Sequence, residues 1–223
     1  MRRKFINITK SLLSVTGYTL ATNMTLMNRA PRFNISDRMD YVRLSSLELC
    51  AYEIQERQIK GSVAELGVYQ GDYSEKINLA FPDRKLYLFD TFEGFDKRDT
   101  AIDTSHKFSD GKQDFSTTSV DAVLSKMKYP SNCIVRKGYF PESAEGVDDT
   151  FCFVSLDVDL YQPTIEGLTY FYARLVPGGY IFVHDYNNDL YKGVKQAVRE
   201  FSANHNVPFF PLPDGAGSAV ICK

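Results

Sequence analysis

Two short segments of the sequence place acids and a histidine directly after apolar runs. Asp157 and Asp159 follow the stretch FCFVSL, and His184 and Asp185 follow YIFV. Carboxylates this close together repel one another unless a cation lies among them. Because most of these ligands are hard oxygens, the sequence predicts a divalent ion, Mg²⁺ or Ca²⁺, held by Asp157, His184 and Asp185. The alternative is that the acids cap helices or bind Lys and Arg side chains.

The same segments hold the candidates for a general base. Alternate residues of an extended segment share one face, so Asp157 and Asp159 are both expected to reach one cleft. If Asp157 contacts the ion, Asp159 is left to accept a proton from a substrate. An imidazole can be a metal ligand, a general base or a hydrogen-bonded core residue, and all three roles stay open for His184. The catalytic candidates are therefore Asp159 and His184.

A glycine-rich segment, GSVAELGVYQG at residues 61–71, points to a nucleoside ligand. Its apolar run is typical of a buried strand, and Gly67 and Gly71 let the backbone turn tightly and approach a ligand. The segment lacks both the G-x-G-x-x-G pattern of dinucleotide sites and the Lys-Ser/Thr of a phosphate loop. A second apolar run ends at Asp90, about 20 residues on, where an acid binds ribose hydroxyls in such folds; a plain strand-end cap is the alternative. S-adenosylmethionine (SAM), a nucleoside without phosphates, fits this pattern.

Parallel strands that alternate with helices would bring these residues together. Strands are expected at 62–67, 85–90, 133–136, 151–157 and 180–184, and helices at 38–58, 72–81, 117–127, from Pro163 to before Pro177, and at 191–204. A hairpin of 207–212 with 218–222 adds an antiparallel strand. This order predicts an α/β fold with a single Rossmann-like, doubly wound and mostly parallel sheet, whose ligands bind beyond the carboxyl ends of the strands. Residues 91–115 are expected to form an irregular loop or lid.

The composition fits one domain with no general attraction for polyanions. A chain of 223 residues with 43% hydrophobic content and a net charge of −2 supports one α/β core. We expect residues 35–223 to form it and residues 1–34 to form an N-terminal helix or lid, with no nucleic-acid or membrane partner. The four cysteines are far apart in apolar patterns, which favours reduced thiols and a cytoplasmic protein. A homo-oligomer stays open.

Several motifs in register resemble the macrocin O-methyltransferase family. They are RMDYVRLSSLELC, VAELGVYQGDYS, LFDTFEGF, KGYFPES, SLDVDLYQPT and LVPGGYIFVHDYNN, and the resemblance covers about residues 35–223. It implies a class I methyltransferase that uses SAM and a divalent metal, usually Mg²⁺, to methylate a hydroxyl of a sugar-type small molecule. We expect seven residues to bind the cofactor: Glu65, Gly67, Tyr69, Gly71, Asp90, Thr91 and Ser119.

The resemblance also implies roles for single residues. Glu65 and Gly67 match the methionine end of the cofactor site, Asp90 the ribose-binding acid, and Ser119 a position near the adenosine. Asp157 matches the first metal-binding aspartate, and Asp159 the proposed base. His184 stands where the family's metal-dependent enzymes carry the first of two aspartates. Because imidazole prefers softer transition metals, this departure weakens the expectation of Mg²⁺.

Two other functions share some of these features. A nicotinamide-dependent oxidoreductase would use Asp90 in the same way, but the phosphate-binding glycines are missing. A domain that binds SAM but has weak or no turnover is the second alternative, and His184 is the feature that hints at it.

Overall fold

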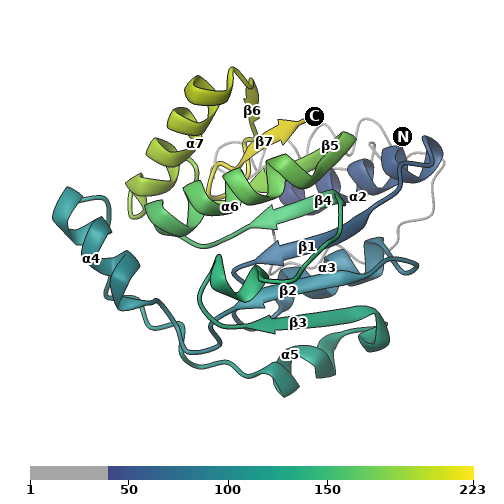
Figure 1. Ribbon diagram of the computed structural model, residues 1–223, viewed down its shortest axis with the longest axis horizontal. Helices are drawn as coiled ribbons and strands as arrows, with labels where there is room; N and C mark the ends of the chain where they lie inside the picture. Colours follow the sequence, from purple (N-terminus) through teal and green to yellow (C-terminus); the bar gives the residue numbers. More distant parts are fainter. Residues whose placement is uncertain (1–39) are drawn as a thin grey trace, which may run out of the picture. The chain divides into compact units, whose positions relative to one another are not determined.

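The computed structural model describes residues 40–223, which lie in one compact unit (Figure 1). Its helices are α2 (Tyr41–Glu56), α3 (Asp72–Ala80), α4 (Lys97–His106), α5 (Val120–Lys126), α6 (Tyr161–Arg174) and α7 (Lys192–His205). Its strands are β1 (Ser62–Leu66), β2 (Leu86–Asp90), β3 (Cys133–Lys137), β4 (Phe151–Leu156), β5 (Leu175–Val183), β6 (Phe209–Pro211) and β7 (Ala219–Cys222). The expected N-terminal segment, 1–34, lies outside the described residues.

The seven strands form one sheet in the order β3-β2-β1-β4-β5-β7-β6. All neighbouring pairs from β3 to β5 are parallel, and β7 runs antiparallel to both β5 and β6. The predicted mostly parallel, doubly wound α/β sheet with an antiparallel C-terminal strand is therefore confirmed. Its order reverses between β1 and β4, and such a switch point opens a crevice at the carboxyl ends of the strands.

Helices cover both faces of the sheet, and each face has its own apolar core. Side chains of α2, α3 and α5 pack on one face, with Leu47 and Ile77 fully buried among them. Side chains of α6 and α7 pack on the other, around Phe171 and Phe201. Figure 1 shows α6 and α7 on the side of the sheet opposite α2 and α3. Strands buried on both sides explain why their sequences are continuously apolar.

The structure corrects three of the expected elements. The stretch expected to be an irregular loop or lid, 91–115, contains α4, which Asp96 caps by accepting a hydrogen bond from the Arg98 amide. The helix expected at 117–127 begins later, because Ser119 rather than Thr117 or Thr118 is its N-cap. The fifth strand begins at Leu175, before the Pro-Gly-Gly expected to precede it.

The described residues also bear on two predictions from composition. No helix among residues 40–223 combines the length and apolar character that a membrane crossing requires. All four cysteines are free thiols.

Candidate active site

The register of the sheet aligns the carboxyl ends of four strands. Leu66 of β1 pairs with Phe89 of β2 and with Leu156 of β4, and Leu156 pairs with Val183 of β5. The residues that follow continue this alignment, because the Gly67, Asp157 and His184 amides donate to the Phe89, Leu66 and Leu156 carbonyls at 2.8–2.9 Å. Gly67, Asp90, Asp157 and His184 therefore emerge side by side at one edge.

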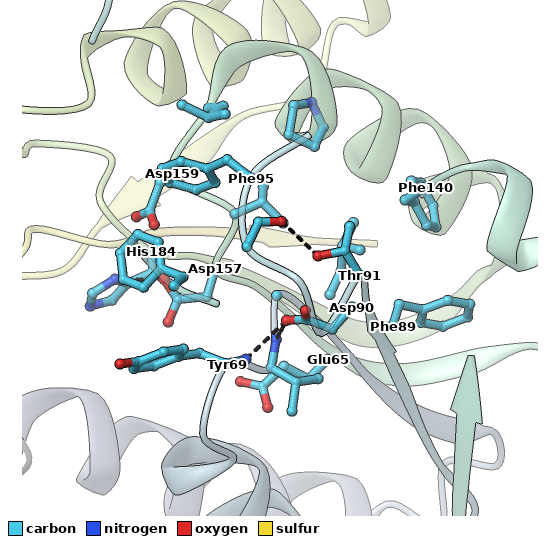
Figure 2. Close-up of a pocket in the computed structure, with 18 of the residues that line it drawn as sticks. Glu65, Tyr69, Phe89, Asp90, Thr91, Phe95, Phe140, Asp157, Asp159 and His184 are labelled. Carbon is cyan, nitrogen blue, oxygen red and sulfur yellow. Dashed lines mark hydrogen bonds and ion pairs between the residues drawn. The ribbon is translucent and has the colours of Figure 1, made fainter. Parts of the chain in front are cut away.

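A cavity of about 400 Å³ opens at this edge, within the size range of small-molecule sites. Its wall includes α4 and the loops after β1, β2, β3, β4 and β5. Among its described lining residues the bases are Arg43 and His184, whereas eight are acids: Glu65, Asp72, Asp90, Asp96, Asp99, Asp157, Asp159 and Asp185. Figure 2 shows Asp157, Asp159 and His184 gathered on one side, and Phe89 and Phe140 on the other.

The glycine loop begins with a close approach between two strands. Gly67 has φ +86°, and a Cβ there would lie 2.0 Å from the Asp157 carbonyl oxygen. Only glycine fits such a contact. Gly71, at φ +79°, is the N-cap of α3 and packs on Val123 of α5, and it is not among the cavity-lining residues. Gly67 thus lines the cavity, whereas Gly71 lets α3 and α5 pack closely together.

Asp90 braces this loop from the neighbouring strand. Its Oδ2 accepts hydrogen bonds from the Val68 and Tyr69 amides at 2.7 and 2.9 Å (Figure 2), and its Oδ1 accepts one from the Phe92 amide at 2.6 Å. Thr91, also at the cavity wall, donates to the Gly94 carbonyl at 2.6 Å. Asp90 therefore fixes the glycine loop and also lines the cavity.

The segment 115–119 approaches the glycine loop from outside. Thr118 donates to the Tyr69 carbonyl, and the Phe115 ring meets the Tyr69 ring edge-on at 5.1 Å between centres. Ser119 is exposed, caps α5 through the Ala122 amide and is not among the cavity-lining residues. Its expected contact with the adenosine stays a prediction, and Phe115 is the cavity-lining residue of this segment.

Asp157, His184 and Asp185 form a compact cluster. The Nδ1 of His184 lies 3.0 Å from Oδ1 of Asp157 and 2.7 Å from Oδ2 of Asp185. One ligand atom from each residue lies within 4.8 Å of the others. Asn188 donates to the second oxygen of Asp185 at 2.6 Å, which fixes that carboxylate. The three predicted metal ligands are thus together.

Asp159 reaches the same place by a different route from the one expected. The chain after β4 is not extended, because Asp159 has φ +62° and the Leu160 amide donates to the Val158 carbonyl at 2.6 Å. The prediction that Asp157 and Asp159 share a face through strand alternation was therefore wrong in its reason. A tight turn, rather than alternation, brings the Asp159 side chain to the cavity beside Asp157 (Figure 2).

The members of this group differ in their affinity for protons. Burial and the nearby charges of Asp157 and Asp185 raise the pKa of Asp159 well above its usual range. Burial opposes the charge on Asp157, but the Arg43 and His184 cations hold the pKa of Asp157 well below its usual range. Burial disfavours the imidazolium, yet Asp157 and Asp185 outweigh it and raise the pKa of His184 to about 10. Of these two acids, Asp157 is the one whose charged form is favoured, and Asp159 is the one with the higher affinity for a proton.

Arg43, in the first turn of α2, is a site residue that the sequence prediction missed. Its Nη2 donates to Oδ2 of Asp157 at 2.8 Å, and its guanidinium carbon lies 3.8 Å from the centre of the Tyr73 ring. A signal for it does exist, because Arg43 stands at helical spacing from the buried Leu47 and Ala51. A charged residue on the buried stripe of a helix needs a buried partner.

Glu65 is the buried penultimate residue of β1 and accepts a hydrogen bond from the Ser74 hydroxyl of α3. Burial raises the pKa of Glu65 to about 8, against the opposing effects of Ser74 and Arg43. The partner of this carboxylate thus belongs to α3, the helix that follows the glycine loop, and its expected place at the methionine end of the cofactor stays a prediction.

Strained backbone marks all four strand ends. The non-glycine residues Tyr69, Phe92, Asp159 and Asp185 have φ between +49° and +62°, and each follows its strand by no more than three residues. Such conformations persist where the surroundings dictate them, and they gather at functional sites.

Comparisons with known proteins agree with this geometry. The chain is 25% identical over 180 residues to mycinamicin III 3''-O-methyltransferase of Micromonospora griseorubida, covering 74% of this chain and 69% of that protein. It is 23% identical over 193 residues to a rhamnosyl-tetracenomycin-C 4'-O-methyltransferase of Streptomyces olivaceus, covering 81% and 72%.

Solved structures show the same fold. The O-methyltransferase NovP matches with a TM-score of 0.66 at 19% identity, over 81% of this chain and 79% of its own. The calicheamicin methyltransferase CalS11 matches with a TM-score of 0.67 at 18% identity, over 96% and 90%.

The sequence model of the family described as macrocin-O-methyltransferase (TylF) matches residues 28–213. This match is to a family of O-methyltransferases and does not support the nicotinamide alternative. The chain belongs to the macrocin-O-methyltransferase family and is a SAM-dependent O-methyltransferase.

Proposed function

We propose that the protein methylates a hydroxyl of a sugar or sugar-containing small molecule, with the help of a divalent metal ion. The observation that supports this most directly is one cavity that joins the glycine loop, Asp90 and the cluster of Asp157, His184 and Asp185. Two related proteins act on rhamnose-type sugars: one is a rhamnosyl-tetracenomycin-C 4'-O-methyltransferase, and CalS11 is a TDP-rhamnose 3'-O-methyltransferase.

The chain's residues divide the cavity between cofactor and acceptor. Asp90 borders the glycine loop and is placed to bind the ribose hydroxyls, with Gly67, Tyr69 and Thr91 around it. Glu65 lies deeper, at the methionine end. The acid cluster lies across the cavity from Phe89 (Figure 2). The acceptor hydroxyl would bind beside this cluster, in line with the methyl carbon and the sulfur of SAM.

The donor set of the cluster fits a divalent metal. Two carboxylates and an imidazole converge, and Arg43 holds one oxygen of Asp157 while the other faces the cluster. A mixed oxygen and nitrogen set suits Mn²⁺, Co²⁺ or Zn²⁺ at least as well as Mg²⁺. An ion bound there would lower the pKa of the acceptor hydroxyl. His184 must lose a proton to become its ligand.

Asp159 is our candidate for the general base. It lines the cavity beside the cluster, and its raised pKa makes its carboxylate a stronger proton acceptor than an exposed aspartate. His184 is the second candidate, because its ring also borders the cavity. In either case the proton leaves the hydroxyl as the methyl group arrives, so no oxyanion is left uncompensated.

A transfer assay tests the acceptor and the metal together. The full-length protein is incubated with SAM carrying a labelled methyl group and a panel of rhamnosides, TDP-rhamnose and simple phenols. Labelled sugar products are expected, with activity lost in EDTA and restored by a divalent ion. Methylation of phenols alone would contradict the sugar acceptor, and full activity in excess EDTA would contradict the metal.

Exchange of the histidine tests whether it is a ligand. His184→Asp should shift the metal that restores most activity toward Mg²⁺, since an all-oxygen set prefers hard ions. An unchanged order of metals would remove His184 from the ligand set.

The four free thiols support a cytoplasmic location, which we propose as well. A homo-oligomer stays a prediction, and size-exclusion chromatography with light scattering decides it.

A further inference from the structure

Arg43 has more hydrogen-bonding capacity than its described partners use. The side chain is 10% exposed and lines the cavity, and it donates to Asp157 through Nη2 alone among its nitrogens. A guanidinium carries five N–H donors in a planar fork that suits a carboxylate. Stacking on Tyr73 fixes the plane of this fork. The nitrogens of this fork that do not bond Asp157 border the cavity wall, so the arrangement favours an anionic ligand from the cavity.

The shape of SAM says which of its groups can reach Arg43. Its sulfonium carries three arms: the methyl group, the adenosyl group and the aminocarboxypropyl arm of methionine. The methyl group must face the acceptor beside Asp159, and the adenosyl group must run toward Asp90. The methionine arm is left with the remaining wall, where Glu65, Arg43 and Tyr73 line the cavity.

This wall carries one acid and one base, as the methionine arm carries one ammonium and one carboxylate. Glu65 and Arg43 interact electrostatically across it. Among the described lining residues Arg43 is the lone guanidinium or ammonium group, and His184 is already engaged by two carboxylates. Among the described lining residues, Arg43 is therefore the side chain that can donate charged hydrogen bonds to the methionine carboxylate.

We propose that Arg43 binds the α-carboxylate of the methionine arm while it holds Oδ2 of Asp157, and so links cofactor binding to the position of the acid cluster. This assignment rests on SAM being the methyl donor. It gives Arg43 a role in both halves of the site, because a bound carboxylate and Asp157 would share one fixed guanidinium.

The test uses ligands that differ in the carboxylate alone. S-adenosylhomocysteine and its decarboxylated form, S-adenosyl-3-thiopropylamine, are titrated calorimetrically into the wild-type protein and into Arg43→Met. The wild type should bind S-adenosylhomocysteine about 10- to 100-fold more tightly, as expected for a charged hydrogen-bonded pair. Arg43→Met should lose that advantage and bind the decarboxylated ligand within about twofold of the wild type.

Matched variants guard against a general loss of folding. Arg84 also has a hydrogen-bonded guanidinium and is partly buried, but it bonds the Gly61 and Ile59 carbonyls at the other end of β1. Arg84→Met should lower the thermal unfolding midpoint and keep the preference for the carboxylate. Arg43→Lys, which keeps the charge but not the fork, should retain part of that preference and serves if Arg43→Met does not fold.

The outcomes separate this inference from the proposed function. Equal wild-type affinity for the two ligands, or an equal loss of both in Arg43→Met or Arg43→Lys, would overturn the role of Arg43. Failure of the wild-type protein to bind S-adenosylhomocysteine at all would instead overturn the SAM site itself.

Discussion

Asp157 and Asp159 stand two residues apart, yet their surroundings differ in charge. Asp157 lies between two cations, Arg43 and His184, and its carboxylate is held on both oxygens. Asp159 lies at a strained turn with acids around it, and its pKa is raised. The first is suited to stay charged and hold an ion, and the second to take up a proton.

Their amide variants should therefore differ in kind. Asp157→Asn should weaken metal binding, so that higher metal concentration partly restores its activity. Asp159→Asn should keep metal and cofactor affinity and lose turnover by about a hundredfold or more, the usual contribution of a placed base. Steady-state kinetics over a metal titration separate the two. Near-normal turnover in Asp159→Asn, with a turnover-only loss in His184→Asn, would make His184 the base.

Glu65 should make stability depend on pH. Its pKa is about 8 in the folded protein against about 4.5 for the free group, so the folded state holds a proton that the unfolded state has released between these values. Its contribution to stability is thus complete below pH 4.5 and is lost as the pH rises toward 8.

The variant Glu65→Gln cannot titrate and keeps an acceptor for Ser74. Its unfolding midpoint relative to the wild type should rise from pH 4.5 to 8 and then level off. The gain is a few kcal/mol at most, since one pKa unit corresponds to about 1.4 kcal/mol. Thermal unfolding across this pH range measures the difference, and a gap that does not change with pH would contradict it. Above pH 8, where the wild-type Glu65 is a carboxylate, the same variant should bind SAM more weakly, because glutamine offers the methionine ammonium no negative charge.

Among single residues, the sequence predicted the site residues that directly follow strands. It missed Arg43, which lies on a helix, and the turn that positions Asp159. Asp157, His184 and Asp185 could be found because each follows an apolar run, and parallel strands end at one edge. Arg43 precedes its partner Asp157 by more than a hundred residues, and no local pattern connects them. The turn at Asp159 could not be seen either, since a left-handed aspartate has no signature in a single sequence.

Among the elements, the unit of β1, glycine loop and α3 should tolerate change least. Gly67→Ala would drive a Cβ into the Asp157 carbonyl, whereas Gly146, at a similar φ of +74°, has nothing within 4 Å. Gly146→Ala should therefore cost about 1 to 2 kcal/mol for its left-handed backbone alone. Gly67→Ala should cost clearly more and abolish cofactor binding. Chemical denaturation and calorimetry compare them, and equal losses would show that the loop can move away from β4.

Elements with an apolar period were predictable, and those held by tertiary contacts were not. The strands and α7 follow their hydrophobic patterns closely. By contrast, α4 is mostly polar, and contacts outside the helix hold it: Asp103 accepts from the Tyr161 amide at 2.9 Å, and the Lys192 amide donates to the Phe108 carbonyl at 3.0 Å. Such a helix depends on α6 and α7, so its own sequence reads as a loop.

For the molecule as a whole, the acid-lined cavity makes ligand charge important. SAM carries a sulfonium charge that S-adenosylhomocysteine lacks, and the lining acids outnumber the bases. The preference for SAM over S-adenosylhomocysteine should therefore shrink as salt rises, because ions screen the attraction. Competitive titrations from about 20 mM to 500 mM salt measure it. A preference that does not respond to salt would mean that contacts rather than charge select the ligand.

The same acidic lining also bears on the release of the demethylated cofactor after each methyl transfer. Each transfer turns the sulfonium into a neutral thioether, so the attraction that drew the donor into the cavity ends at the moment the reaction is complete. SAM then competes for the cavity with S-adenosylhomocysteine, whose neutral sulfur the lining acids do not attract. The fixed carboxylates thereby act after the chemical step as well as before it, by clearing the site for the next turnover.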